Sequence, residues 1–236
     1  MSPESSRRSV SRIPLTLHAG YKLRLMPPAL AIFDLDGTLA DSYPWFLRHV
    51  NDVADRFGFR RIADGDAEAL RHAGSHDILR RLEGPLWKLP AIARYMRRLK
   101  AASLADIALF PVVSVMLRAL SESGVRLVLV SSDHEDNARV QLGAANAAMF
   151  SDFACGASLF GKPAKFRRVL NRAGVEPARA IAIGDEVRDI EAARAAGIAC
   201  AAVTWGYAAS AALRAHGPDL VFDHIHEIAP SLLAQA

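Results

Sequence analysis

The sequence predicts an α/β protein: a Rossmann-like parallel-sheet core with helices on both faces, plus an inserted all-α cap domain. Short, almost wholly apolar segments recur along the chain, and amphipathic helical patterns separate most of them. Strands that are buried on both faces have this apolar character, and parallel strands need a crossover between them, usually a helix. A long stretch without any strand signal follows the first apolar segment, and this stretch predicts the cap.

Six apolar segments are the expected strands. The first ends at Phe33, and the others lie in residues 125–132, 149–155, 178–185, 197–206 and 219–223. Helical patterns cover residues 111–123, 136–142, 163–173 and 187–196. Gly124, Gly174 and Gly197 each follow one of these patterns, as glycines that end helices do. The alternation of strand and helix indicates a parallel sheet covered on both sides.

Residues 42–105 interrupt this alternation between the first and second expected strands. They have only helical patterning, over residues 44–57, 66–72, 76–83 and 89–100. Several arginines lie in the helix expected over residues 89–100, and they are more typical of a solvated helix face than of a substrate-facing patch. We therefore expect three parts: a basic, disordered tail over residues 1–27, a core formed by residues 28–41 and 106–236, and a helical cap over residues 42–105.

Charge and composition exclude several classes of protein. The 236-residue chain has a net charge of +4, and residues 1–27 account for all of it. The remainder is neutral overall, which argues against a broad nucleic-acid-binding face. No apolar run is long enough to span a bilayer, and no secretory signal is recognisable. We expect a cytoplasmic monomer or homodimer that contacts neither nucleic acid nor membrane and keeps Cys155 and Cys200 as reduced thiols.

Polar residues gather where the expected strands end and where the following helices begin. They are Asp34, Asp36, Ser131, Ser132, Lys162, Asp185 and Asp189. Ligands of open parallel sheets bind outside the carboxyl ends of the strands, so these side chains are expected at one rim.

Carboxylates this close together repel one another unless a cation compensates them. Mg²⁺ prefers oxygen ligands, and Asp34 and Asp185 can supply them while a substrate phosphate supplies another. An aspartate can then attack phosphorus and form an aspartyl-phosphate. Asp36 can protonate the leaving alcohol and later deprotonate water. Ser131 can donate a hydrogen bond to a phosphoryl oxygen, and Lys162 adds a positive charge.

These residues, in this order, resemble the four motifs of the haloacid dehalogenase-like (HAD) hydrolase superfamily. The matching segments are "DLDGT" at residues 34–38, Ser131, Lys162 and "GDEVRD" at residues 184–189. The place of the cap resembles the helical-cap subfamily, and "SLFGKPAKFRRVL" and "VTWGY" look like its phosphoglycolate phosphatase-like members. The resemblance implies a Mg²⁺-dependent phosphatase acting on a small phosphorylated metabolite, with phosphoglycolate as the default substrate.

The resemblance also implies a role for each residue. Asp34 would be the nucleophile and a Mg²⁺ ligand, Asp185 a second ligand, and Asp36 the acid–base whose backbone carbonyl also binds Mg²⁺. Thr38 would brace the first-motif loop, and Asp189 would support the metal ligands. The expected phosphate-binding residues are Asp34, Leu35, Asp36, Ser131, Ser132 and Lys162.

Two assignments have competitors in the sequence. Lys165 lies three positions after Lys162, so both lysines can share a helix face. The place of Lys162 at the helix start favours it as the motif lysine. Asp189 could instead pair with Arg188 or Arg194 at the surface.

The choice of substrate is expected to lie in the cap, at its helices and at the loop residues Gly74, Ser75 and His76. This loop is faintly like the cap loop of sugar phosphomutases, which makes a phosphomutase the alternative enzyme. Such a loop usually carries a basic residue, which His76 matches poorly.

Other functions on the same scaffold fit less well. A dehalogenase would lack an acid at the position of Asp36. A phosphonatase would need a cap lysine for a Schiff base, and nothing in the sequence marks out Lys88 or Lys100. A non-catalytic binding or regulatory module is the alternative outside catalysis, although every expected catalytic position is filled.

Overall fold

The computed structural model describes residues 27–63, 65–66, 71, 82–84, 86–156 and 161–234 of the chain. Within these residues, six strands form one sheet in the order β3-β2-β1-β4-β5-β6, and every pairing is parallel. The strands are β1 (Leu30–Phe33), β2 (Arg126–Val130), β3 (Phe150–Ala154), β4 (Ala180–Gly184), β5 (Ala199–Val203) and β6 (Leu220–Phe222). Each lies in a segment expected to be a strand, so the predicted parallel core is confirmed.

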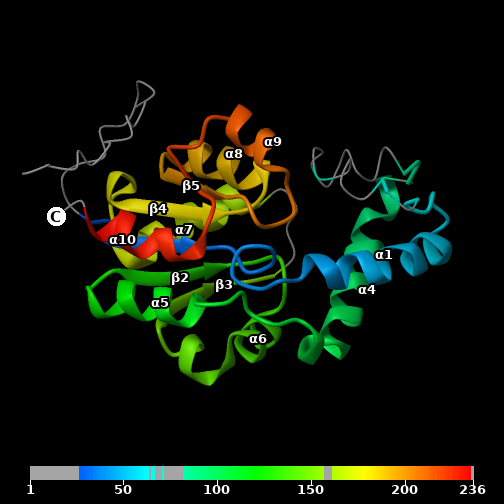
Figure 1. The fold of residues 1–236 in the computed structure, drawn as a ribbon, viewed down its shortest axis with the longest axis horizontal. Helices are drawn as coiled ribbons and strands as arrows, with labels where there is room; N and C mark the ends of the chain where they lie inside the picture. Colours follow the sequence, from blue (N-terminus) through cyan, green and yellow to red (C-terminus); the bar gives the residue numbers. More distant parts are fainter. Residues whose placement is uncertain are drawn as a thin grey trace, which may run out of the picture.

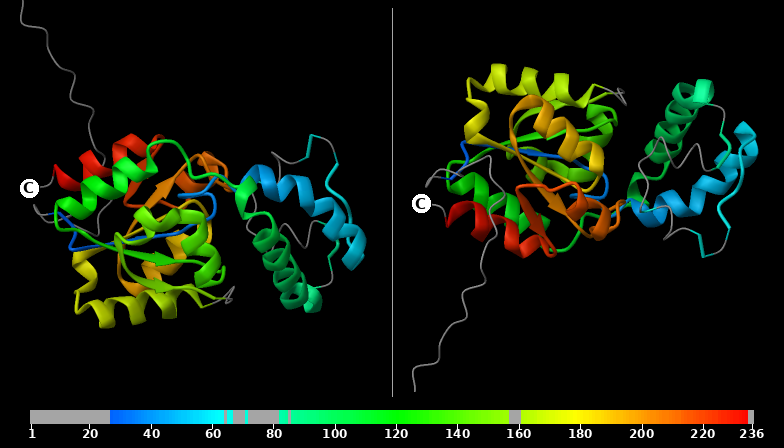
Figure 2. Two further views of the ribbon diagram at one scale, coloured as in Figure 1. Left: turned by 90° about the horizontal axis from the view of Figure 1, so that it is seen from below. Right: turned by 90° about the horizontal axis from the view of Figure 1, so that it is seen from above.

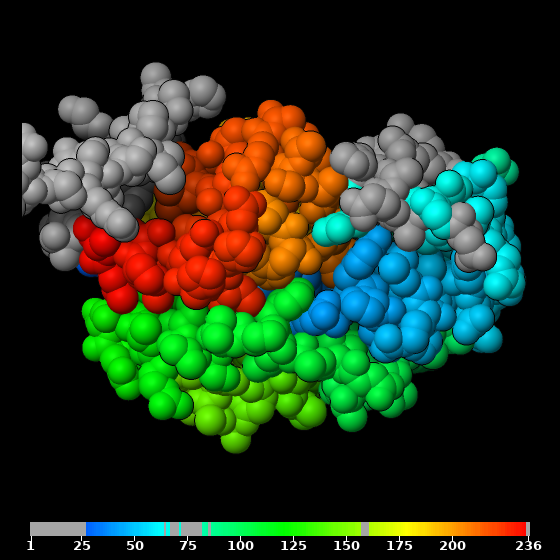
Figure 3. All heavy atoms as spheres, viewed as in Figure 1, coloured from blue at the N-terminus to red at the C-terminus, as the bar shows by residue number. Residues whose placement is uncertain are grey.

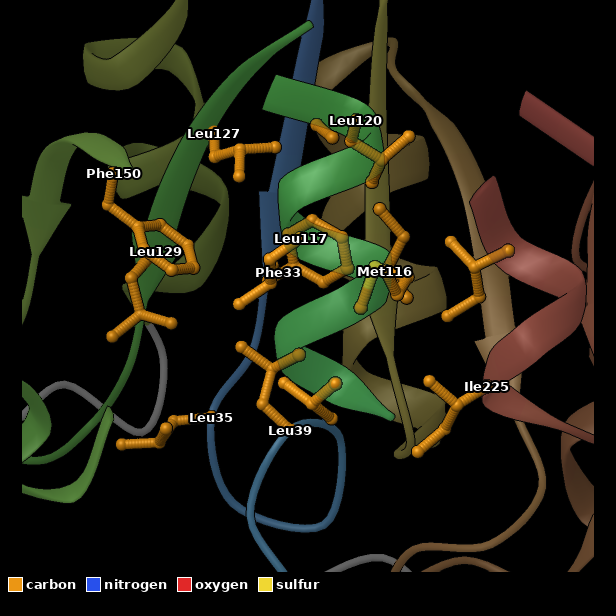
Figure 4. Close-up of a cluster of buried hydrophobic side chains, with 14 of the residues drawn as sticks. Phe33, Leu35, Leu39, Met116, Leu117, Leu120, Leu127, Leu129, Phe150 and Ile225 are labelled. Atoms are coloured by element: carbon orange, nitrogen blue, oxygen red, sulfur yellow. The ribbon is translucent and has the colours of Figure 1, made fainter. Parts of the chain in front are cut away.

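Helices cover both faces of the sheet. On one face lie α5 (Val113–Glu122), α6 (Glu135–Ala147) and α10 (Ile228–Leu233), and on the other α7 (Lys162–Ala173), α8 (Val187–Ala196) and α9 (Ser210–Ala215). Strand β1 divides its side chains between two buried clusters: Ala31 and Phe33 pack with α5, whereas Leu30 and Ile32 pack with α7 and α8. Figure 4 shows Leu117 of α5 beside Phe33.

Two further helices lie beyond the carboxyl ends of the strands, apart from the sheet (Figures 1 and 2). They are α1 (Tyr43–Phe57) and α4 (Leu89–Ala102), and both belong to the inserted helical cap that the sequence predicts. Short 3₁₀ turns occur at Leu86–Lys88, Leu104–Asp106, Pro177–Arg179 and Ile225–Glu227. Among the residues described, no helix is both long enough and apolar enough to cross a membrane.

The cap contacts the core through aromatic side chains. The ring of Tyr43, at the start of α1, meets the ring of Tyr207 edge to face, with 5.1 Å between the centroids. Phe46 contacts the same tyrosine at 5.7 Å. In Figure 3, the blue atoms of α1 accordingly lie against the core. The cap helices therefore stand close to the rim at which the sequence places the polar residues.

Several expectations from the sequence fall on other parts of the chain. The helices expected over residues 66–72 and 76–83 lie largely outside the described residues, and so does nearly all of the expected tail. The cap-loop candidates Gly74, Ser75 and His76 lie wholly outside them. The boundaries 42–105 of the cap domain stay a prediction.

The two cysteines are free thiols, as expected. Cys200 is buried in β5, and Cys155 is half-buried after β3. Burial raises the pKa of Cys155 to about 11, and it raises the pKa of Cys200 as well. Both thiols therefore stay protonated at neutral pH.

Candidate active site

Asp34 stands at the carboxyl end of β1 with its side chain buried. Its backbone N–H donates to the carbonyl oxygen of Ile183 at 3.0 Å, so pairing with β4 continues past the last residue of the strand. The carboxylate oxygen Oδ1 accepts the N–H of Leu35 at 2.9 Å. The other oxygen, Oδ2, accepts Lys162 Nζ at 2.8 Å. A lysine thus compensates a carboxylate whose burial would otherwise be costly.

Lys162 and Lys165, the two candidates for the motif lysine, have different partners. Lys162 is the first residue of α7, and its Nζ lies between Asp34 and Asp189. Burial alone would lower the pKa of Lys162, but Asp189 and Asp34 raise it above its ordinary value. Lys165 instead donates to the backbone carbonyls of Ser131 and Gly156, each at 2.7 Å. The geometry therefore favours Lys162 as the lysine that acts on Asp34.

Asp185 follows β4, the strand next to β1, and is fully buried. Its Oδ1 accepts the hydroxyl of Thr38 at 2.7 Å, and its Oδ2 accepts the N–H of Tyr207 at 2.8 Å. Burial, together with the charges of Glu186, Asp34 and Asp189, raises its pKa well above the ordinary value. Thr38 thus ties the loop after β1 to the loop after β4.

Carboxylate oxygens of Asp34, Asp185 and Asp189 all lie within 4.8 Å of one another. Asp189 is 2% exposed and pairs with Lys162, so it lies inside the site and not in a surface pair with Arg194. Three buried carboxylates against one lysine leave a negative charge that a divalent cation would offset. An all-oxygen donor set of this kind suits Mg²⁺. The residues present therefore fit the metal that the sequence resemblance implies.

A pocket of about 290 Å³ opens beside this cluster. Its lining includes Asp34, Ser131, Ser132, Lys162, Lys165 and Arg188. Lys162, Lys165 and Arg188 are cationic, whereas Asp34 and Glu191 are anionic, so the lining has an excess of positive charge that can hold an anion such as a phosphate group. The Ser131 hydroxyl accepts the N–H of Asp133 at 3.1 Å, which leaves its own proton to donate.

A family model described as haloacid dehalogenase-like hydrolase matches residues 31–203. The chain belongs to this family. The match spans both the first-motif loop and the loop after β4, and it confirms the resemblance drawn from the sequence. It also makes the chain an enzyme of the hydrolase class.

Curated relatives of this HAD-like hydrolase bear the name phosphoglycolate phosphatase. One from Synechococcus elongatus is 33% identical over 206 residues, which cover 87% of this chain and 95% of the relative. Phosphoglycolate phosphatase 1 of Pseudomonas aeruginosa is 30% identical over 216 residues, which cover 86% of this chain and 79% of the relative.

Solved structures agree with the fold. A HAD-like hydrolase from Streptococcus pneumoniae superposes with a TM-score of 0.70 at 22% identity, covering 88% of this chain and 98% of that one. CbbY from Rhodobacter sphaeroides, solved in complex with phosphate, superposes with a TM-score of 0.65 at 23% identity, and the match covers 85% of this chain and 96% of that one.

The side chain of Asp36 is not part of the carboxylate cluster of this HAD-like hydrolase and pairs with Lys100 of the cap. In the sequence, Lys100 is considered only as a possible Schiff-base lysine, and nothing there marks it out for that role. One signal was present: Lys100 follows Met96 by four residues, and Met96 packs against the core. Residues so spaced share a helix face, which places the lysine on the face that meets the core.

Gly37 in the first-motif loop is expected to tolerate no side chain. Its φ is +76°, and a Cβ there would overlap the carboxylate of Asp185 and the ring of Tyr207. We expect Gly37→Ala to lower the free energy of unfolding by at least about 2 kcal/mol, since left-handed strain and overpacking each cost on the order of 1 kcal/mol or more. Turnover should fall too, because Asp185 must move.

Gly124 provides the matched control for this substitution. Its φ is +82°, and a Cβ there would meet no atom within 4 Å. Gly124→Ala should therefore cost only the strain, about 1 kcal/mol, and leave turnover unchanged. Urea unfolding measures the free energy of unfolding of both variants. Equal losses of this free energy would show that the close approach of residue 37 to Asp185 is unimportant.

Proposed function

We propose that this enzyme is a Mg²⁺-dependent phosphatase that hydrolyses a small phosphomonoester through an aspartyl-phosphate on Asp34. The observation that carries the proposal is the pairing of a buried Asp34 with Lys162 at the wall of a pocket that three cationic side chains line. A carboxylate in that place adjoins a bound phosphate group, and the lysine reduces the repulsion between the two anions. The carboxylate cluster and the curated relatives named phosphoglycolate phosphatase support it further.

In the first step, a carboxylate oxygen of Asp34 attacks phosphorus while the bond from phosphorus to the ester oxygen breaks. Asp36, as a general acid, transfers its proton to the departing alkoxide, which leaves as the alcohol. Lys162 keeps Asp34 oriented, and Ser131 and Ser132 donate hydrogen bonds to phosphoryl oxygens.

In the second step, a water molecule attacks the phosphorus of the aspartyl-phosphate. Asp36, now a carboxylate, takes a proton from that water, and the bond between phosphorus and the Asp34 oxygen breaks. Inorganic phosphate is released, while Asp34 and Asp36 return to their starting forms.

The proposed Mg²⁺ would be held by Asp34, Asp185 and the backbone carbonyl of Asp36. When bound, it supplies positive charge that lets an anionic carboxylate approach an anionic phosphate. Thr38 orients Asp185 through its hydroxyl, and Asp189 orients Lys162.

Phosphoglycolate is the substrate we propose first, because the cited relatives carry its name. The test compares kcat/KM for phosphoglycolate, several sugar phosphates and nucleotides, with Mg²⁺ and after its removal by a chelator. We expect turnover only with Mg²⁺ and the highest kcat/KM for phosphoglycolate.

Each other outcome assigns a different function. Preference for another ester would replace the substrate and keep the phosphatase. Isomerisation of a sugar phosphate without phosphate release would identify a phosphomutase. Absence of turnover with every ester would support a non-catalytic binding module.

A further inference from the structure

Lys100 is buried where helix α4 returns from the cap to the core. The residue is 5% exposed, and it is the one buried residue of α4, all of which the structure describes. Lysines are almost never fully buried without a charged partner. This burial therefore calls for a specific role of the ammonium group.

The ammonium group of Lys100 contacts two carboxylates of the core. Its Nζ lies 2.7 Å from Oδ1 and 2.7 Å from Oδ2 of Asp36, so it spans both oxygens. The same nitrogen lies 2.9 Å from Oδ2 of Asp133. Among the described residues, the structure gives the Asp36 carboxylate no other charged partner.

Asp133 is itself held firmly in place. It is 2% exposed, and its Oδ1 accepts the N–H of His134 at 2.7 Å and Nδ2 of Asn137 at 2.9 Å. Its own N–H donates to the hydroxyl of Ser131 at 3.1 Å. One oxygen of Asp133 thus organises the loop after β2, and the other is left for Lys100.

We propose that Lys100 is a positioning residue that the cap contributes to the reaction, and that it aims the carboxyl group of Asp36 at the leaving group. The inference rests on the proposed phosphatase function. An ammonium group that spans both oxygens restrains rotation of the Asp36 side chain. Because Lys100 also pairs with Asp133, it stays in place when one Asp36 oxygen turns to the ester oxygen. The acid–base is thereby ordered only while α4 is docked on the core.

The sharpest test of this role varies the need for a proton on the leaving group. An alkyl phosphate needs Asp36 to protonate its alkoxide, whereas p-nitrophenyl phosphate releases an anion that is stable without a proton. In Lys100→Met, we expect the first-turnover release of the alcohol to slow by about 10- to 100-fold, within the range of general acid catalysis. First-turnover release of p-nitrophenolate should change less than about threefold, because that leaving group needs no proton from Asp36, and KM should stay unchanged.

Two further variants complete the design. Lys88→Met is the matched control, because Lys88 is a cap lysine whose Nζ donates to the carbonyl of Phe57, outside the pocket. Asp133→Asn keeps Lys100 and loosens its anchor, so it should give a smaller loss on the alkyl ester alone. Combined with Lys100→Met, it should add little, as expected for residues that act through one contact.

The results separate this proposal from the phosphatase function. The role of Lys100 would be overturned if the release of both leaving groups slowed equally, or if neither Lys100→Met nor Asp133→Asn slowed the release of the alcohol. Turnover by the wild-type enzyme would still support the phosphatase function in that case. Wild-type enzyme without turnover on any phosphomonoester would overturn both. If Lys100→Met does not fold, Asp133→Asn alone decides by the same comparison of leaving groups.

Discussion

Replacing Asp34 with Asn is expected to abolish turnover while the fold stays intact. The two side chains have nearly the same shape, and the amide oxygen can still accept the N–H of Leu35, which now donates to Asp34 at 2.9 Å. The amide carries no charge and cannot form an aspartyl-phosphate. We expect kcat to fall by about 10³-fold or more, as when other covalent nucleophiles are removed.

Steady-state hydrolysis with Mg²⁺ measures this loss, and thermal unfolding confirms that the variant is folded. Asp136→Asn is the matched control, because Asp136 is exposed in the first turn of α6 and should not affect turnover. Retained activity in the Asp34→Asn variant would rule out the covalent mechanism.

Removing the positive charge of Lys162 should reduce both stability and activity. Lys162→Met leaves the carboxylates of Asp34 and Asp189, which are 8% and 2% exposed as side chains, without their lysine. Breaking a buried pair in this way costs about 3–5 kcal/mol. The repulsion between Asp34 and the incoming phosphate also rises, so kcat should fall by about 10²-fold or more.

Lys165→Met separates the roles of the two lysines. Lys165 donates to two backbone carbonyls and does not contact Asp34, so its loss should lower kcat by less than about tenfold. Parallel kinetics and urea unfolding of the two variants provide the measurement. A larger loss in Lys165→Met would make Lys165 the motif lysine.

The core and the polar rim could be predicted because each depends on local sequence. Strands buried on both faces leave uninterrupted apolar segments, and β1 and β4 are read directly from them. The rule that ligands bind at the carboxyl ends then brings Asp34, Lys162 and Asp185 together. In the structure, Asp34 and Lys162 line one pocket, and Asp34 and Asp185 belong to one carboxylate cluster.

Contacts between the cap and the core could not be predicted in this way. Lys100 meets Asp36 across 64 positions of sequence, and the meeting depends on how α4 docks. Arg71 likewise donates to the carbonyl of Gly206 at 2.7 Å and lies over the ring of Tyr43. A helix pattern shows which face is apolar, but it does not show which loop of another domain that face will meet.

The order of the strands has a consequence for the way the chain folds during synthesis. β1 is made first, yet it lies at the centre of the sheet, where Leu30 pairs with Arg126 of β2 on one side and Ala180 of β4 on the other. The edge that pairs with β2 must therefore wait until the cap has been synthesised, and the edge that pairs with β4 must wait until most of the core has been synthesised. Such late, long-range pairing is slow and exposes a strand to aggregation. The strand that leads to the proposed nucleophile is thus one whose pairing is completed late in synthesis.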